Sequence, residues 1–212
     1  MKKKHPRTYH IPWSESISAD DKTIESLTQF YNKEIIITEK RDGECTSLYN
    51  DGYIHARSID GNSHPWQTII KSEWRQKCFN FPNGWRIVGE NLYAEHSISY
   101  VTLKSWIEIF AIFDENNIAI SWDSMIEWCE LLELNPVPIL YRGIFNYNFI
   151  RDFHKTLDLD KQEGYVMRIS DEINYDNWGL EVCKWVRKNH VQTDDEHWTK
   201  NWKPNKLMSG DK

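Results

Sequence analysis

Short runs of apolar and β-branched residues, each bounded by polar turn-forming residues, recur along most of the chain and predict β-strands. Asn50, Asp51 and Gly52 provide the turn of a hairpin between two of these runs. Residues 115–117 end another run with similar turn-forming residues. The predicted strands cover residues 35–38, 46–49, 53–56, 85–94, 105–115, 136–143, 163–170 and 181–189.

Three other stretches have apolar residues at helical spacing. The first, residues 18–32, begins near a capping Ser18 or Asp20. The second covers residues 122–134 and is closed by prolines, and the third covers residues 148–158. The apolar faces consist of Ile24, Leu27 and Phe30 in the first helix and of Met125, Trp128, Cys129 and Leu132 in the second.

The order of these elements indicates an α+β fold with mainly antiparallel sheets and peripheral helices. The 212 residues suit one large domain, and no repeat or linker divides them. We expect a single domain over residues 1–212, with residues 1–17 and 190–212 as peripheral segments. No apolar run approaches the roughly 18 residues of a membrane helix. The basic N-terminus lacks the apolar segment of a secretory signal, so no membrane attachment is expected.

The net charge of −6 argues against a protein that coats nucleic acid without selectivity. A local basic groove is still compatible with it, because lysines and arginines cluster at the N-terminus and in residues 184–188 and 200–206. The four cysteines form no Cys-x-x-Cys pair, and we expect reduced thiols in a cytoplasmic protein. They are Cys45, Cys78, Cys129 and Cys183.

Lys40 follows the apolar run of residues 35–38, with Glu39 between them, and is expected to point into the protein. A lysine there loses much of its hydration and needs a partner or a purpose. Its surroundings, Glu-Lys-Arg-Asp-Gly, contain a Lys-x-Asp-Gly match, which alone occurs by chance in about one such sequence in twenty. Five further elements come after it in order. They are HARS around Arg57, VGENLY around Glu90, FAIFDE ending at Phe113-Asp114, EGYVMR from Glu163, and VCKWVRKN around Lys184.

In this order the six elements resemble those of the covalent nucleotidyltransferase superfamily, and most closely those of ATP-dependent RNA ligases. The resemblance covers residues 39–189, most of the chain. It implies the nucleotidyltransferase fold, in which antiparallel sheets flank a nucleotide-binding cleft. It also implies RNA repair chemistry, in which the 3′-hydroxyl and 5′-phosphate ends of a nicked duplex or a broken loop are joined. ATP and either Mg2+ or Mn2+ are the implied cofactors.

By this resemblance, Lys40 attacks the α-phosphate of ATP, releases pyrophosphate and holds AMP through a phosphoramidate bond. Such an amine reacts only when neutral, so we expect burial and neighbouring cations to lower its pKa from about 10.4. Glu163 is expected to hold the catalytic metal through water, and Glu90 to bind ribose hydroxyls or assist with the metal. Lys184 corresponds to the family's final lysine, which stabilises charge on the α-phosphate.

Five further residues have implied contacts with the nucleotide. Glu39 resembles the residue that contacts the adenine amine, with an exposed strand-end glutamate as the alternative. Phe113 holds the place of an aromatic that stacks on adenine, with core packing as the alternative. Arg57 is a donor for phosphate or ribose and helps with the terminal nucleotides of the nick. Asp42 is expected to orient the ribose or the nucleophile, and Gly43 to allow unusual backbone angles or close approach to the nucleotide.

The last element departs from the family pattern. A second lysine often comes two residues after the first, but that position is Val186, with Arg187 and Lys188 next. Either cation could substitute for it, although alternation along a strand would turn Arg187 to the face opposite Lys184. Arg187 is therefore a secondary candidate for binding the nucleotide.

Two other groups of residues are weaker candidates for a site. His154, His190 and His197 have no convincing metal-ligand spacing and are expected to be structural or exposed. Residues 196–212 mix aromatic and basic side chains. That mixture suits contact with a nucleic-acid strand and equally a tail docked on the core.

Two alternatives to an RNA ligase are open. One is a DNA ligase or a GTP-dependent RNA-capping enzyme, both of which usually carry an oligonucleotide-binding barrel after the last element. About two dozen residues follow Asn189, too few for such a barrel, so none is expected, although a partner protein could supply extra RNA-binding surface. The other is a non-catalytic nucleotide- or RNA-binding relative, which the joint presence of Lys40, Glu163 and Lys184 disfavours.

Overall fold

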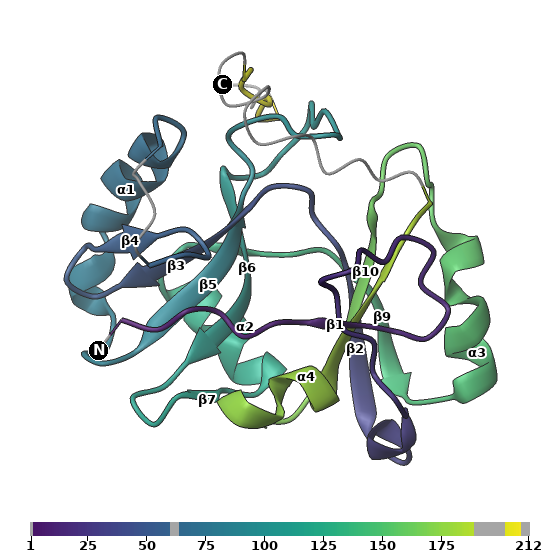
Figure 1. Cartoon of the computed structure of the whole chain (residues 1–212). Coiled ribbons are helices and arrows are strands. Elements are labelled where there is room, and N and C mark those ends of the chain that lie inside the picture. Colours follow the sequence, from purple (N-terminus) through teal and green to yellow (C-terminus); the bar gives the residue numbers. More distant parts are fainter. Residues whose placement is uncertain (1, 60–63, 189–201, 209–212) are drawn as a thin grey trace.

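The computed structural model describes residues 2–59, 64–188 and 202–208, and their strands form two sheets on opposite sides of the view in Figure 1. The first sheet has the order β1-β12-β10-β2-β9, with β1 (Tyr9–His10), β12 (Val182–Val186), β10 (Gly164–Ile169), β2 (Glu34–Glu39) and β9 (Ile139–Ile144). The second has the order β11-β7-β6-β5-β3-β4, with β11 (Ile173–Asn174), β7 (Ile118–Ala119), β6 (Ile107–Phe113), β5 (Arg86–Asn91), β3 (Glu44–Tyr49) and β4 (Ile54–His55), and β8 (Asn135–Pro136) pairs with β6.

Most neighbouring strands are antiparallel, and in the described part of the chain only β1 with β12 and β6 with β8 run parallel. The helices lie around the sheets, with α1 and α3 at the two outer edges of Figure 1. The expected α+β fold with mainly antiparallel sheets and peripheral helices is confirmed. The helices are α1 (Gln67–Arg75), α2 (Trp122–Leu131), α3 (Tyr147–Asp152) and α4 (Trp178–Glu181), and the 3-10 turns are η1 (Thr28–Phe30), η2 (Cys78–Asn80), η3 (Phe153–Thr156) and η4 (Tyr175–Asn177).

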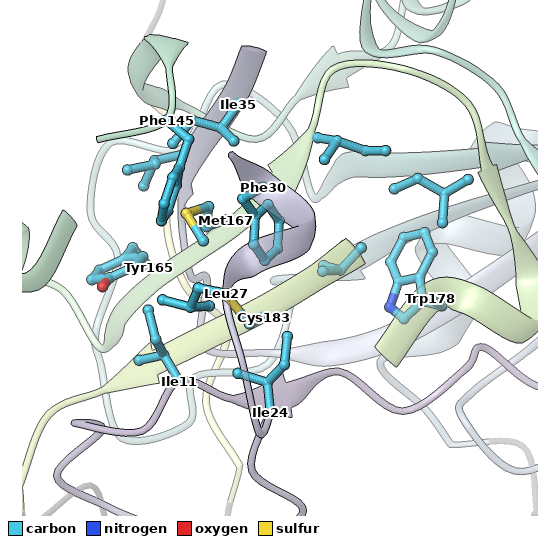
Figure 2. Close-up of a cluster of buried hydrophobic side chains, with 14 of the residues drawn as sticks. Ile11, Ile24, Leu27, Phe30, Ile35, Phe145, Tyr165, Met167, Trp178 and Cys183 are labelled. Atoms are coloured by element: carbon cyan, nitrogen blue, oxygen red, sulfur yellow. The ribbon is translucent and has the colours of Figure 1, made fainter. Parts of the chain in front are cut away.

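Strand β2 is buried on both faces, which explains its uninterrupted run of isoleucines. Ile35 and Ile37 belong to the buried cluster shown in Figure 2, which also contains Met167 from β10. Ile36 points to the other face and joins a second cluster with Ile87 from β5. A strand buried on both sides carries the residues that come after it into the interior rather than to the surface. The end of β2 therefore positions the Lys-x-Asp-Gly turn inside the molecule.

The predicted helix over residues 18–32 is wrong. The chain before η1 instead lies against β1, where the His10 nitrogen donates to the Lys22 carbonyl and the Ile24 nitrogen to the His10 carbonyl. These two bonds take up the Lys22 carbonyl and the Ile24 nitrogen, which would otherwise form helical bonds. The apolar residues that suggested a helix are still buried, but from an irregular segment. They are Ile24, Leu27 and Phe30.

The other expected elements are present with changed ends. The second helix is α2, which Ser121 caps through its hydroxyl and which buries Met125 and Cys129. The third shortens to α3 followed by η3. The predicted hairpin turn has Gly52 at a φ of 75°, the left-handed region that glycine adopts without strain. Helix α1 was not expected from the sequence pattern.

Two global expectations can be compared with the structure. Among the described residues, no helix has the length and apolar character needed to cross a membrane. Each of the four cysteines is free, and three of them are buried. Burial raises the pKa of Cys129 to about 12, so this thiol stays protonated and packs as a small apolar group.

Candidate active site

A cavity of about 1040 Å3 opens between the two sheets. Its lining comes from the end of β2, from β3, β5, β10 and β12, and from the segment before and after β1. Most of the residues singled out in the sequence meet there, although they are far apart in the chain. Those that line the cavity are Glu39, Lys40, Asp42, Gly43, Arg57, Glu90, Glu163 and Lys184, whereas Phe113 and Arg187 do not line it.

Lys40 and Glu163 form an ion pair inside this cavity, with 2.5 Å between Nζ and Oε2. The pairing of β2 with β10 sets it, since Glu39 lies opposite Tyr165 and the Lys40 nitrogen donates to the Gly164 carbonyl. The Lys40 side chain is 23% exposed and that of Glu163 is 3% exposed. The lysine is therefore turned inward, as the sequence indicated, and its partner is a buried carboxylate.

The charges around Lys40 differ from the expectation. Burial lowers the pKa of Lys40, but the carboxylates of Glu163, Glu90 and Asp42 outweigh burial and hold the pKa above its ordinary value. The expected lowering of the pKa is thus wrong for the cavity formed by the protein's residues alone. Activation of Lys40 then requires that positive charge reach these carboxylates, or that they turn away.

Glu90 faces Lys40 from β5 in the opposite sheet. Burial raises the pKa of its carboxyl to about 8, although the Lys40 ammonium acts in the opposite direction. Among the described residues, none donates a hydrogen bond to the Glu90 carboxylate. A half-buried carboxyl without such donors has unused acceptor capacity, which suits a sugar hydroxyl or a cation.

Asp42 fixes the turn that comes after Lys40. Its Oδ2 accepts hydrogen bonds from the Ser97 nitrogen, the Ser97 hydroxyl and the Ile98 nitrogen at 2.8, 2.6 and 2.9 Å. Its own nitrogen donates to the Tyr100 hydroxyl at 3.0 Å. These bonds join the turn to the loop of residues 95–100 and hold it in place. Asp42 thus fixes the turn that carries Lys40.

Two glycines allow strands to approach closely beside Lys40 and Glu163. A Cβ at Gly43 would lie 2.4 Å from the Asn91 carbonyl oxygen, and one at Gly164 would lie 2.0 Å from the Trp185 carbonyl oxygen. No side chain fits such spaces without movement of the backbone. The close approach of β5 therefore requires a glycine at position 43, which also lines the cavity.

Glu39 is buried at the end of β2 and is not an exposed strand-end residue. Its Oε1 accepts a hydrogen bond from Arg41 Nη1 at 2.6 Å, and its Oε2 accepts one from Gln162 Nε2 at 3.1 Å. Arg41 also donates to both oxygens of Glu108, at 2.6 and 3.2 Å. The carboxylate of Glu39 is thus held by donors from two sides, with further lone pairs available toward the cavity.

Lys184 enters the cavity from β12, where it lies opposite Val166. Burial, then the neighbouring Lys40 ammonium, lower its pKa, which Asp21 partly offsets from 3.6 Å away. Asp21 also lies 3.3 Å from the buried His10 ring, whose pKa burial and Lys184 lower to about 4. The irregular segment that was predicted to be a helix therefore supplies an acidic partner of Lys184.

Phe113 does not lie where the sequence placed it. It is fully buried, with the Arg86 guanidinium 3.9 Å from its ring centre and Trp178 beside it. Core packing, the alternative, is what the structure shows. Phe110 lines the cavity instead, because the register of β6 with β5 shifts there and leaves Phe110 without an opposite residue. Simple alternation along the strand cannot anticipate such a bulge.

The two remaining arginines have different surroundings. Arg57 lines the cavity, and in the described part of the chain it has no carboxylate partner, so its donors are available to an anionic ligand. Arg187 lies after the end of β12 and does not line the cavity, although its nitrogen donates to the Glu163 carbonyl at 3.0 Å. The expectation that Arg187 faces the nucleotide is wrong, because strand alternation turns it away from Lys184.

The carboxylates can be tested as ligands for a divalent cation. In residues 2–59, 64–188 and 202–208, no group of three His, Cys, Asp or Glu side chains is arranged to hold a metal ion. Magnesium does not need such a group, because it keeps several waters and binds one or two carboxylates together with phosphate oxygens. Glu163, which is buried, and Glu90, which is half-buried, lie around Lys40 and fit that requirement.

The described part of the C-terminal tail, residues 202–208, docks on the protein. Asn205 is buried; its Nδ2 donates to the Leu92 carbonyl and its Oδ1 accepts from the Tyr100 nitrogen, both at 2.8 Å. The tail thus supports the loop that holds Asp42. His190 and His197 lie outside the described residues, and His154 stacks on the Trp185 ring rather than lying in the cavity.

Three solved structures illustrate what the fold is similar to. One is an archaeal ATP-dependent RNA ligase, which has 13% sequence identity and a TM-score of 0.59 and in which the match covers 86% of this chain and 48% of that chain. The second is a Naegleria gruberi RNA ligase variant with ATP and Mn, which has 17% identity and a TM-score of 0.55, with 86% of this chain and 60% of that chain covered. The third is a putative ATP-dependent DNA ligase from Aquifex aeolicus, which has 22% identity and a TM-score of 0.54, with 74% of this chain and 45% of that chain covered. The chain spans about half the length of these proteins. They confirm the expected nucleotidyltransferase-type ligase fold.

The sequence comparisons add the family. No sequence matches in the comparison with curated proteins. Residues 33–186 match the family model described as RNA ligase, and this range contains Lys40, Glu90, Glu163 and Lys184. Because the match covers most of the chain, the chain belongs to the RNA ligase family.

Proposed function

We propose that this protein is an ATP-dependent RNA ligase that works through a lysyl-AMP intermediate on Lys40. The observation that carries the proposal is the ion pair of Lys40 with Glu163 in a cavity that Glu90 and Lys184 also line. Burial of an amine together with two carboxylates and a second ammonium costs free energy. Such groups of buried charges are typical of sites that carry out chemistry. Membership in the RNA ligase family supports the same reaction.

In the first step, the neutral Nζ of Lys40 attacks the α-phosphorus of ATP. A nitrogen–phosphorus bond forms, the nitrogen loses one of its protons, and the bond from that phosphorus to the pyrophosphate oxygen breaks. Lys184, from the neighbouring strand β12, is placed to stabilise negative charge on the α-phosphate, and its charge also favours the neutral form of Lys40. Magnesium or manganese held by Glu163 and Glu90 would neutralise phosphate and carboxylate charge.

Three residues suit recognition of the nucleotide. Glu39 offers a fixed carboxylate that can accept a hydrogen bond from the adenine amine. Phe110 replaces Phe113 as the aromatic candidate to stack on the base, because it is the one of the two that lines the cavity. Arg57 offers donors to phosphate or ribose.

The second and third steps transfer the AMP and then release it. An oxygen of an RNA 5′-phosphate attacks the phosphorus of AMP, and the bond to Lys40 breaks, with the amine taking up a proton. A 3′-hydroxyl then attacks the RNA phosphate, loses its proton, and AMP leaves as the phosphodiester forms. A nicked duplex or a broken loop would present both ends together, and a partner protein that adds RNA-binding surface belongs to this proposal.

Incubation of the protein with α-labelled ATP and magnesium tests the first step. The wild type should retain label, and Lys40→Ala should not, while Lys155→Ala, an exposed lysine on η3, should label like the wild type. An unlabelled wild type with a cooperative unfolding transition would overturn the proposal. Parallel reactions with matched RNA and DNA ends separate RNA ligation from DNA ligation, and α-labelled GTP separates the capping alternative.

A further inference from the structure

Arg41 directly follows the nucleophile Lys40 in the chain. Its guanidinium lies beside the cavity and pairs with two carboxylates. Nε and Nη2 donate to the two oxygens of Glu108, and Nη1 donates to Glu39. The Arg41 side chain is 14% exposed, Glu39 is 10% exposed and Glu108 is 3% exposed. The Tyr100 ring lies 4.9 Å from the guanidinium carbon. Glu108 is therefore the most buried member of the group and holds the guanidinium through two bonds.

Glu39 and Arg41 both line the cavity, whereas Glu108 does not. The two lining groups have opposite hydrogen-bonding character, because a carboxylate only accepts and a guanidinium only donates. The two common purine nucleotides differ at the ring position that carries the amine in adenine. That amine donates a hydrogen bond, while the carbonyl oxygen of guanine at the same position accepts one. Whichever of the two lining groups meets this position decides which base is bound.

We propose that Glu108 is a positioning residue that sets the preference for adenine over guanine. This inference rests on the proposed function, in which Glu39 meets the base. Glu108 holds the Arg41 guanidinium away from the base and shares its positive charge, so that Glu39 presents acceptor capacity to the cavity. Glu108 touches neither the nucleotide nor Lys40 and acts only through Arg41.

Removal of the charge of Glu108 changes the partners of Arg41. The guanidinium loses two charge-assisted bonds, and Glu39 becomes the nearest carboxylate for all of its donors. Closer pairing with Arg41 weakens Glu39 as an acceptor for the adenine amine. The N–H groups that Glu108 releases become donors for a carbonyl oxygen in the cavity. Both effects favour guanine at the expense of adenine.

The test compares lysyl-nucleotide formation from α-labelled ATP and α-labelled GTP, each with magnesium. Glu108→Gln should lower the ratio of ATP to GTP labelling by about tenfold or more, which is the usual discrimination of one charged hydrogen bond. Glu108→Asp, which keeps the charge but shortens its reach, should change the ratio less in the same direction. Glu34→Gln is the matched control, because it breaks a Glu–Arg pair outside the cavity and should leave the ratio unchanged.

A double variant separates positioning from a general effect on the fold. Arg41→Gln combined with Glu108→Gln removes both buried charges, so no free guanidinium is left to meet guanine, and the ATP preference should return toward that of the wild type. Both nucleotides are compared on one preparation, so partial unfolding lowers both labels and leaves their ratio unchanged.

The outcomes distinguish this inference from the proposed function. A wild type that takes no label from either nucleotide overturns the proposed function. A wild type that labels from ATP, together with an unchanged ratio in Glu108→Gln, overturns the role of Glu108 alone. A double variant that stays as unselective as Glu108→Gln overturns the claim that Glu108 acts through Arg41.

Discussion

The cavity has two kinds of wall. Lys40, Glu90, Glu163 and Lys184 lie on or directly beside long strands whose hydrogen-bonded register sets their positions. The rest of the lining, the irregular wall, consists of loops and segments without regular structure, which reach the site through side-chain bonds such as that of Asp42 to Ser97. The strands therefore carry the groups to which we assign the proposed chemistry, while the irregular segments set their surroundings.

The two walls also differ in charge. The strand wall brings opposite charges together, with the Lys40 ammonium near the buried carboxylate of Glu163 and the half-buried carboxylate of Glu90. The irregular wall adds Asp21, whose carboxylate raises the pKa of Lys184 and so offsets part of the lowering caused by burial. We therefore expect changes in the strand wall to affect activity most, and changes in the irregular wall to affect mainly stability.

The largest effect should come from Glu163→Gln in the strand wall. It removes the carboxylate 2.5 Å from Lys40 Nζ and one of the two candidate metal ligands. The rate of labelling by α-labelled ATP should fall by about a hundredfold or more. Glu181→Gln, which breaks the partly exposed pair with Lys33, is the control and should keep the wild-type rate. Labelling of Glu163→Gln at the wild-type rate would contradict the assignment of chemistry to this wall.

A smaller effect, on stability, should come from His10 on β1, which contacts Asp21 of the irregular wall. Burial and Lys184 lower its pKa from 6.5 to about 4. Between these values the unfolded chain binds a proton that the folded chain does not, so stability is full above pH 6.5 and is lost as the pH falls toward 4. The complete loss corresponds to about 3 kcal/mol.

Urea unfolding at pH 7 and pH 5 measures this dependence. His10→Gln should show a clearly smaller loss of stability between the two pH values than the wild type. Equal losses in both proteins would mean that His10 does not contribute in this range.

The next effect in size should come from Asn205→Ala in the tail. The change leaves the buried Leu92 carbonyl and Tyr100 nitrogen without their partner, which costs about 2 kcal/mol of unfolding free energy. Labelling by ATP well below the unfolding temperature should stay within about threefold of the wild type. A hundredfold loss of labelling in a folded Asn205→Ala protein would show that the irregular wall takes part in the chemistry.

The smallest effect should come from Arg142→Ala on β9, outside both walls. Its guanidinium pairs with Glu34 and Asp123 at the surface, and all three side chains are more than a third exposed. Such pairs contribute about 0–1 kcal/mol, so unfolding free energy should change by less than about 1 kcal/mol. A larger loss of unfolding free energy would mean that these exposed ion pairs contribute substantially to the stability of the fold.

The strand wall could be predicted from the sequence because its signals are local. Apolar runs identify β2, β10 and β12, and Lys40 and Glu163 each lie at the end of one such run. Antiparallel pairing then brings such ends together. The burial of Glu39 and the inward direction of Lys40 are consequences of the same pattern.

The irregular wall could not be predicted because its positions depend on contacts between distant residues. The backbone bonds of residues 22–24 with His10 override a plausible helical pattern. The family resemblance pointed to Phe113, but the bulge at Phe110 leaves that residue unpaired and changes which side chains face the cavity. The pKa of Lys40 also depends on three carboxylates whose distances no sequence pattern gives.

Peptide mapping by mass spectrometry after incubation with ATP and magnesium identifies the residue that carries the nucleotide. We expect one added adenylyl group on the peptide that contains Lys40, lost from that peptide in Lys40→Ala. An adenylyl group on another residue, or none on a folded wild-type protein, would contradict the role of Lys40 as the nucleophile.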